Sequence, residues 1–75
     1  MKEYAQYISI NPAIRFGKPC ITGTRITVGD ILTWLATGMT PHEIIGDYPS
    51  LKGEHIKAAL FFAANRETMV KIVAG

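Results

Sequence analysis

The sequence predicts a mainly α-helical domain in which three helices, arranged as in helix-turn-helix proteins, follow a segment of short strands. Three observations predict this class. Capping signals mark helix starts after residue 26, the first 26 residues form short extended pieces, and 75 residues suffice for one core. We therefore expect a single domain over 1–75, with strands and turns over 1–26 and helices over 27–75. The alternative is a generic helical bundle with no nucleic-acid role.

Short strands are predicted in the first third. Residues 7–10 alternate apolar and polar side chains, as a strand does. A second strand is expected at 20–22, and Gly23 permits a tight reversal, so that 25–26 returns beside it in a hairpin. Strands this short need helices, or a second copy of the chain, to pack on.

The first predicted helix covers 28–37. Thr27 is a typical N-cap, and Asp30 three residues later completes a capping box. Apolar residues then recur at helical spacing, and Gly38 stands where a glycine commonly ends a helix.

The second and third helices have start signals of different strength. Thr40, Pro41 and Glu43 form an N-cap, a first-turn proline and a capping box, and they predict a helix over 41–47. The third helix begins near Gly53 without a good N-cap, and no breaker in its pattern ends it before about residue 74.

The third helix is apolar on two faces. One face, expected to pack on the other helices, holds Ile56, Ala59, Leu60, Ala63 and Val70. The opposite face also carries apolar residues, and a chain this short has little left to cover them. We expect this face to contact a second chain through Phe61, Phe62, Met69 and Ile72. The alternative is that the N-terminal strands fold over it.

A homodimer is also expected from size, since small domains without disulfides or a metal often gain stability by association. The single Cys20 excludes an internal disulfide.

Positive charge is concentrated in the first third of the chain. Residues 1–25 carry a net charge of +3, whereas residues 26–75 carry −1. This distribution favours the N-terminal segment as the surface for an anionic polymer. The candidate DNA-binding residues are Arg15, Lys18 and Arg25, together with Lys52 and Lys57 near the start of the third helix. For Arg25 the alternative is a structural ion pair with Asp30 or Asp47.

No catalytic, metal or cofactor site is expected. The two histidines lack a third ligand, Cys20 lacks a recognisable base, and no phosphate-binding loop precedes a helix. Without such a site we do not expect an enzyme. The longest apolar run is far too short for a membrane span, and no signal peptide is evident, so we expect a cytoplasmic protein.

One run of residues is specific to a family. The segment 17–28, GKPCITGTRITV, resembles the signature of the domain of unknown function 433 family, and the resemblance extends from about Ile8 to Ala64. Cys20 stands where an aliphatic residue is more usual, and Lys52 opens the third helix without a good cap. Both are departures from the family's pattern.

The resemblance implies a helix-turn-helix-like fold and, for some members, the role of a VapB-type antitoxin. Such a protein binds a PIN-like ribonuclease toxin and operator DNA. On this basis we expect an antitoxin-like homodimer. The alternative is a protein-interaction or assembly module without nucleic-acid binding.

Overall fold

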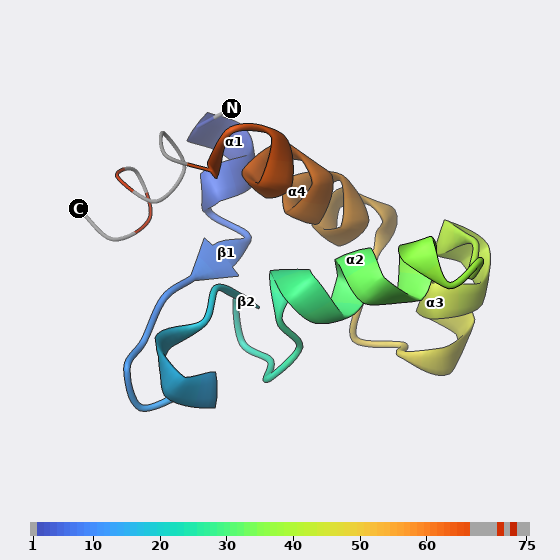
Figure 1. The fold of residues 1–75 in the computed structure, drawn as a ribbon, viewed down its shortest axis with the longest axis horizontal. Coiled ribbons are helices and arrows are strands. Elements are labelled where there is room, and N and C mark those ends of the chain that lie inside the picture. Colours follow the sequence, from blue (N-terminus) through green and yellow to red (C-terminus); the bar gives the residue numbers. More distant parts are fainter. Residues whose placement is uncertain (1, 67–70, 72, 74–75) are drawn as a thin grey trace.

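The chain folds as three helices preceded by a helical turn and a two-stranded sheet (Figure 1). The structure is a computed structural model that describes residues 2–66, 71 and 73. Its elements are α1 (Lys2–Ala5), β1 (Ile8–Ser9), the 3₁₀ turn η1 (Arg15–Gly17), β2 (Cys20–Ile21), α2 (Val28–Ala36), α3 (Pro41–Asp47) and α4 (Gly53–Ala64). The predicted fold class, mainly α with short N-terminal strands, is confirmed.

The two strands pair differently from the predicted hairpin. β2 lies antiparallel to β1, with Ile8 opposite Ile21 and Ser9 opposite Cys20. The expected return strand is reduced to one bridge between Cys20 and Thr27 and a hydrogen bond of 2.8 Å from the Ile21 amide to the Ile26 carbonyl. The segment after Gly23 turns into α2 too soon to continue a ladder.

Both predicted capping boxes are present. Thr27 Oγ1 accepts the Asp30 amide at 2.8 Å, and Asp30 Oδ2 accepts the Thr27 amide at 3.0 Å. At the start of α3, Thr40 and Glu43 make the same two bonds at 3.1 and 2.9 Å. These reciprocal bonds satisfy amides that a helix start otherwise leaves unpaired. They explain why α2 and α3 begin where the sequence predicts.

A tight turn joins α2 to α3. Gly38 has a φ of +100°, its amide bonds to the Leu35 carbonyl at 3.1 Å, and the Met39 amide bonds to the Trp34 carbonyl at 3.0 Å. This pair of bonds is the Schellman pattern. The Trp34 ring then stacks on Tyr48 at the end of α3, with ring centroids 4.2 Å apart. The ring contact fixes the ends of the two helices against each other.

Helix α4 is shorter than predicted. It starts at Gly53, where His55 Nδ1 accepts the Lys52 amide at 2.9 Å in place of the missing N-cap side chain. It ends at Ala64, because Asn65 leaves helical backbone angles and its Nδ2 donates to the Phe61 carbonyl at 3.2 Å. Asparagine competes with helix geometry by such local bonds. The predicted uninterrupted helix is therefore interrupted at Asn65, and residues 67–70, 72 and 74 of its predicted range lie outside the described residues.

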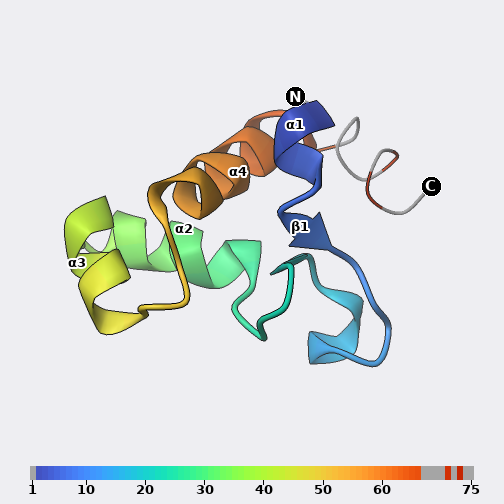
Figure 2. The same cartoon turned by 180° about the vertical axis from the view of Figure 1, so that it is seen from behind.

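The core lies between α4 and its neighbours. Ile21, Ile31, Ile44 and Leu51 are fully buried, and α4 adds four buried residues: Ile56, Ala58, Ala59 and Phe62. Helix α4 packs on α2 and also on α1, which both views place beside its C-terminal half (Figures 1 and 2). Two neighbours therefore bury two sides of this helix.

The predicted division of α4 into two faces needs correction. Phe62, expected at a protein interface, is 2% exposed and belongs to the core, whereas Leu60, expected in the core, is 47% exposed. The reason is α1, which the sequence did not predict and whose Tyr4 ring stacks on Phe61 at 4.7 Å. The N-terminal segment does cover α4, with a helical turn and not with its strands.

Within the described residues, no helix is long and apolar enough to span a lipid bilayer.

Candidate functional site

The turn η1 has a left-handed backbone. Arg15, Phe16 and Gly17 have φ angles of +48°, +60° and +80°. For a residue with a Cβ, this conformation costs about 1–2 kcal/mol. Gly17 adopts it freely, whereas Arg15 and Phe16 do not. Interactions elsewhere must hold the two side-chain-bearing residues in place.

Arg15 supplies such interactions. Its Nη1 donates to the Arg25 carbonyl at 2.9 Å and lies 3.2 Å from Asp30 Oδ2. Its guanidinium thus links η1, the turn after β2 and the start of α2. The ion pair with Asp30 that was considered for Arg25 is therefore made by Arg15. Arg15 is thus already paired with a carboxylate and is less available to bind a phosphate.

Asp30 is held in its charged form. Burial raises the pKa of this carboxyl, but the hydrogen bonds with Thr27 and the nearby charge of Arg15 outweigh burial, so the pKa lies below its ordinary value. A charged Asp30 neutralises Arg15 locally. The net positive charge at this end of the molecule consequently comes from other residues.

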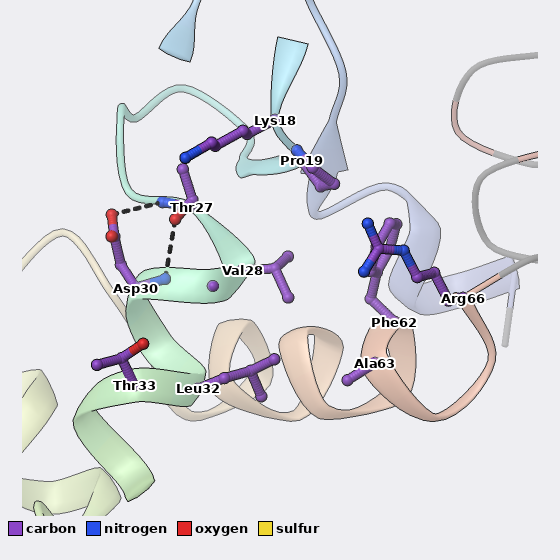
Figure 3. A pocket seen from close by; sticks show the side chains of 11 residues that line it. Lys18, Pro19, Thr27, Val28, Asp30, Leu32, Thr33, Phe62, Ala63 and Arg66 are labelled. Atoms are coloured by element: carbon purple, nitrogen blue, oxygen red, sulfur yellow. Dashed lines mark hydrogen bonds between the residues drawn. The ribbon is translucent and has the colours of Figure 1, made fainter. Parts of the chain in front are cut away.

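A groove of about 500 Å³ opens beside this ion pair (Figure 3). Apolar side chains from α2 and α4 line it, among them Val28, Leu32 and Phe62, and the Thr27–Asp30 capping box forms part of its wall. Lys18 and Arg66 bring two cations to the same groove from opposite parts of the chain. We call the surface formed by Arg15, Phe16, Lys18, Arg25 and Arg66 the basic end.

The cations of the basic end are available to a ligand. Lys18, Arg25 and Arg66 are exposed, and the described part of the chain gives none of them an acidic partner. The predicted DNA-binding residues Arg15, Lys18 and Arg25 thus lie together. Lys52 and Lys57 do not line the groove. They lie at the start of α4, next to α3 (Figure 1), where the His55 ring contacts Tyr7 with ring centroids 5.2 Å apart.

Sequence reasoning missed two residues of the basic end. Arg66 lies far from Lys18 in sequence, and only the packing of α4 on α2 brings it to the groove. Phe16 is 97% exposed. Its only sequence signal was an aromatic residue between an arginine and a glycine in a turn.

The remaining candidate interface is a small surface on α4. Leu60 and Phe61 are 47% and 38% exposed, although Phe61 also stacks on Tyr4. Met69 and Ile72, which were predicted to belong to the same interface, lie outside the described residues. The structure thus leaves two exposed apolar side chains, consecutive in sequence, on α4.

Cys20 is placed as a core residue. It is buried, and its Sγ donates to the Lys18 carbonyl at 3.3 Å. Burial raises the pKa of the thiol against the opposing influence of Arg15, which disfavours the nucleophilic thiolate. In the part of the chain that the structure covers, no three His, Cys, Asp or Glu side chains gather as a metal ion requires.

Comparison with known proteins identifies relatives of this fold. The profile of the family described as "Protein of unknown function (DUF433)" matches residues 8–63. A crystal structure of a DUF433 member protein from Anabaena variabilis superposes with a TM-score of 0.75 at 28% identity, covering 93% of this chain and 70% of that one. A search of curated proteins found no match.

Proposed function

Because the chain belongs to the DUF433 family, and because three exposed cations without acidic partners among the described residues lie at the basic end, we propose that it is a non-enzymatic, antitoxin-like binding module that contacts DNA through this end. The observation that carries this proposal is that Lys18 and Arg66 line one groove, beside the turn of Arg25 that Arg15 ties to η1, and that none of these three cations has an acidic partner among the described residues. Cations so placed attract phosphate groups and release the counterions that surround DNA.

The distribution of carboxylates supports the same surface. Among the acids whose side chains the structure describes, Asp30 is the one that lines the groove, and Arg15 pairs with it. Glu43 and Asp47 belong to α3, and Glu54 belongs to the first turn of α4, both at the other end of the fold (Figure 1). This distribution of the described carboxylates favours the approach of DNA at the basic end.

The direct test is DNA binding measured by fluorescence anisotropy, using the segment upstream of the gene as the probe. Affinity is expected to fall steeply with salt concentration. The double variant Lys18→Gln, Arg25→Gln should bind more weakly. The slope of log K against log salt concentration should become shallower by about 0.9 for each lost phosphate contact. Arg15 is left intact in this test because its ion pair belongs to the fold.

A matched control uses the two lysines at the other end. The double variant Lys52→Gln, Lys57→Gln removes the same charge, and it should retain the affinity and salt slope of the wild type. Equal losses in both double variants would mean that net charge alone matters. An unaffected Lys18, Arg25 variant would rule out the basic end as the DNA contact.

The proposal includes a homodimer. One support is the exposed apolar pair Leu60 and Phe61 on α4. The other is that a chain of 8.2 kDa can form only a small core, so that association would add stability. Light scattering of the purified protein should give twice the mass of the chain. Leu60→Glu should reduce that mass to one chain while circular dichroism remains that of the folded protein.

The proposed toxin partner has a specific test. If a PIN-like ribonuclease is encoded beside this gene, co-expression should yield a stable complex and suppress the ribonuclease activity. The second candidate, a protein-interaction module without DNA binding, is favoured by the same exposed pair on α4. A stable complex combined with no salt-dependent DNA binding would support it.

A further inference from the structure

The Phe16 side chain is not packed against the described part of the chain. Its side chain is 97% exposed, and the described residues provide it with no ring contact. The other two phenylalanines differ from it, since Phe61 stacks on Tyr4 and Phe62 is buried. An aromatic side chain that gains nothing from burial contributes no hydrophobic stabilisation.

The backbone at Phe16 makes its identity more unusual. With φ of 60° and ψ of 32° it is left-handed, a conformation that suits Gly or Asn and opposes a bulky side chain. Arg15, in the same conformation, is held by Asp30 and by the Arg25 carbonyl. Phe16 makes no such bonds. Backbone hydrogen bonds of 3.1 Å, from Gly17 to Ile14 and from Lys18 to Arg15, hold the turn. The Phe16 side chain adds no packing that would offset its strain, which points to a function for the ring outside the chain.

The neighbours of Phe16 indicate what it would contact. Arg15 ties η1 to the turn that carries Arg25, and Lys18 directly follows η1, so the segments next to Phe16 carry two exposed cations. A protein interface usually has an apolar core, and among the described residues no other exposed large hydrophobic side chain belongs to η1 or the turns beside it. An aromatic ring among phosphate-binding cations is instead the arrangement of proteins that stack a side chain on nucleic-acid bases.

From these observations we propose that Phe16 stacks on a base of the nucleic acid held at the basic end, while Lys18 and Arg25 contact the adjacent phosphates. The ion pair of Arg15 with Asp30 holds η1 so that the ring is presented before binding. This inference rests on the proposed function, and it adds that recognition involves an accessible base as well as the backbone.

The test compares Phe16→Asn with Phe16→Tyr. Asparagine tolerates the left-handed conformation, so the first variant removes the ring and relieves strain, whereas tyrosine keeps the ring. Binding is measured by anisotropy with a fluorescein-labelled single-stranded oligodeoxynucleotide of mixed sequence and with its duplex. We expect Phe16→Asn to bind roughly tenfold to a hundredfold more weakly, with Phe16→Tyr close to wild type.

Two further measurements separate stacking from charge and from folding. The salt slope should be unchanged in Phe16→Asn and reduced in Lys18→Gln, because only the lysine contacts a phosphate. The thermal midpoint of Phe16→Asn should equal or exceed that of the wild type. The single strand should lose more affinity than the duplex, since its bases are already accessible.

The outcomes are distinguishable from those of the proposed function. If the wild type binds DNA and Phe16→Asn binds it with the same affinity, the stacking inference is overturned and the proposed function is not. No binding by the wild type at low salt overturns both proposals. If Phe16→Asn changes the mass seen by light scattering and leaves DNA affinity unaltered, the ring contacts protein and the inference is wrong.

Discussion

The Arg15 guanidinium lies 3.2 Å from the Asp30 carboxylate and so joins a left-handed turn to the start of α2. The same carboxylate accepts the Thr27 amide in the capping box. One acidic side chain thus serves two structural purposes. The side chains of the pair are 34% and 32% exposed, so solvent screens their attraction.

Removal of this carboxylate should destabilise the fold. We expect Asp30→Ala to lower the free energy of unfolding by about 1–2 kcal/mol, mostly through loss of the capping box. In a double-mutant cycle with Arg15→Ala, urea denaturation should give a coupling below about 1 kcal/mol, as is usual for solvated ion pairs. Asp47→Ala is the control, and it should leave stability unchanged or slightly raised because its carboxylate ends α3. A larger coupling would mean that the pair is better shielded than its exposure indicates.

Acid should weaken the fold through the two capping carboxylates. Burial raises the pKa of Asp30, but its hydrogen bonds with Thr27 and the charge of Arg15 lower it by more, so the net result is a lowered pKa. The hydrogen bonds with Thr40 lower the pKa of Glu43. A lowered folded-state pKa stabilises the protein fully above the unfolded values of about 3.9 and 4.3, and this stabilisation is lost as pH falls through the folded-state values. Urea midpoints should therefore drop as the pH falls below about 5. The double variant Asp30→Asn, Glu43→Gln should show a smaller drop, and an identical profile would contradict the assignment.

Two glycines should respond to alanine in opposite directions. Gly38 has a φ of +100°, so Gly38→Ala should lower the free energy of unfolding by about 1–2 kcal/mol. Gly46 lies in α3, where an added Cβ meets no atom within 4 Å, so Gly46→Ala should raise stability by about 0.5–1 kcal/mol. Thermal unfolding followed by circular dichroism measures both. Similar shifts in the two variants would exclude the left-handed turn after α2.

The buried and exposed faces of α4 should separate by mutation. Phe62→Ala removes a core side chain and should cost about 3–5 kcal/mol at every protein concentration. Leu60→Ala should cost much less, and in a homodimer its cost should depend on concentration, because it would act through association. Unfolding curves at two protein concentrations test this. Equal, concentration-independent losses would place Leu60 in the core after all.

The sequence was most informative where structure is local. The starts of α2 and α3 follow from capping boxes only four residues long, such as that of Thr27 and Asp30, and the glycine after α2 marks its end. The end of α4 was missed because Asn65 is a weak breaker by composition, and its effect comes from one side-chain bond to Phe61. Sequence rules give no strong signal for a helix end that depends on one side-chain hydrogen bond.

Contacts between distant segments were beyond such rules. The clustering of Lys18 and Arg25 was expected from the charge distribution, but the pairing of Arg15 with Asp30 requires the left-handed turn at η1, which a Phe at its centre does not suggest. Likewise, helical periodicity placed Phe62 opposite Ile56. It had no means of anticipating that α1 would cover the second side of α4.

The stacking of Trp34 on Tyr48 has a practical consequence for spectroscopy. Trp34 is the only tryptophan in the chain, and its ring lies 4.2 Å from Tyr48 where α2 meets α3. Its emission should report the detachment of α3 from α2 and should be insensitive to a ligand at η1. Intrinsic fluorescence and an extrinsic dye on the ligand would therefore follow folding and binding as two separate signals in the same cuvette.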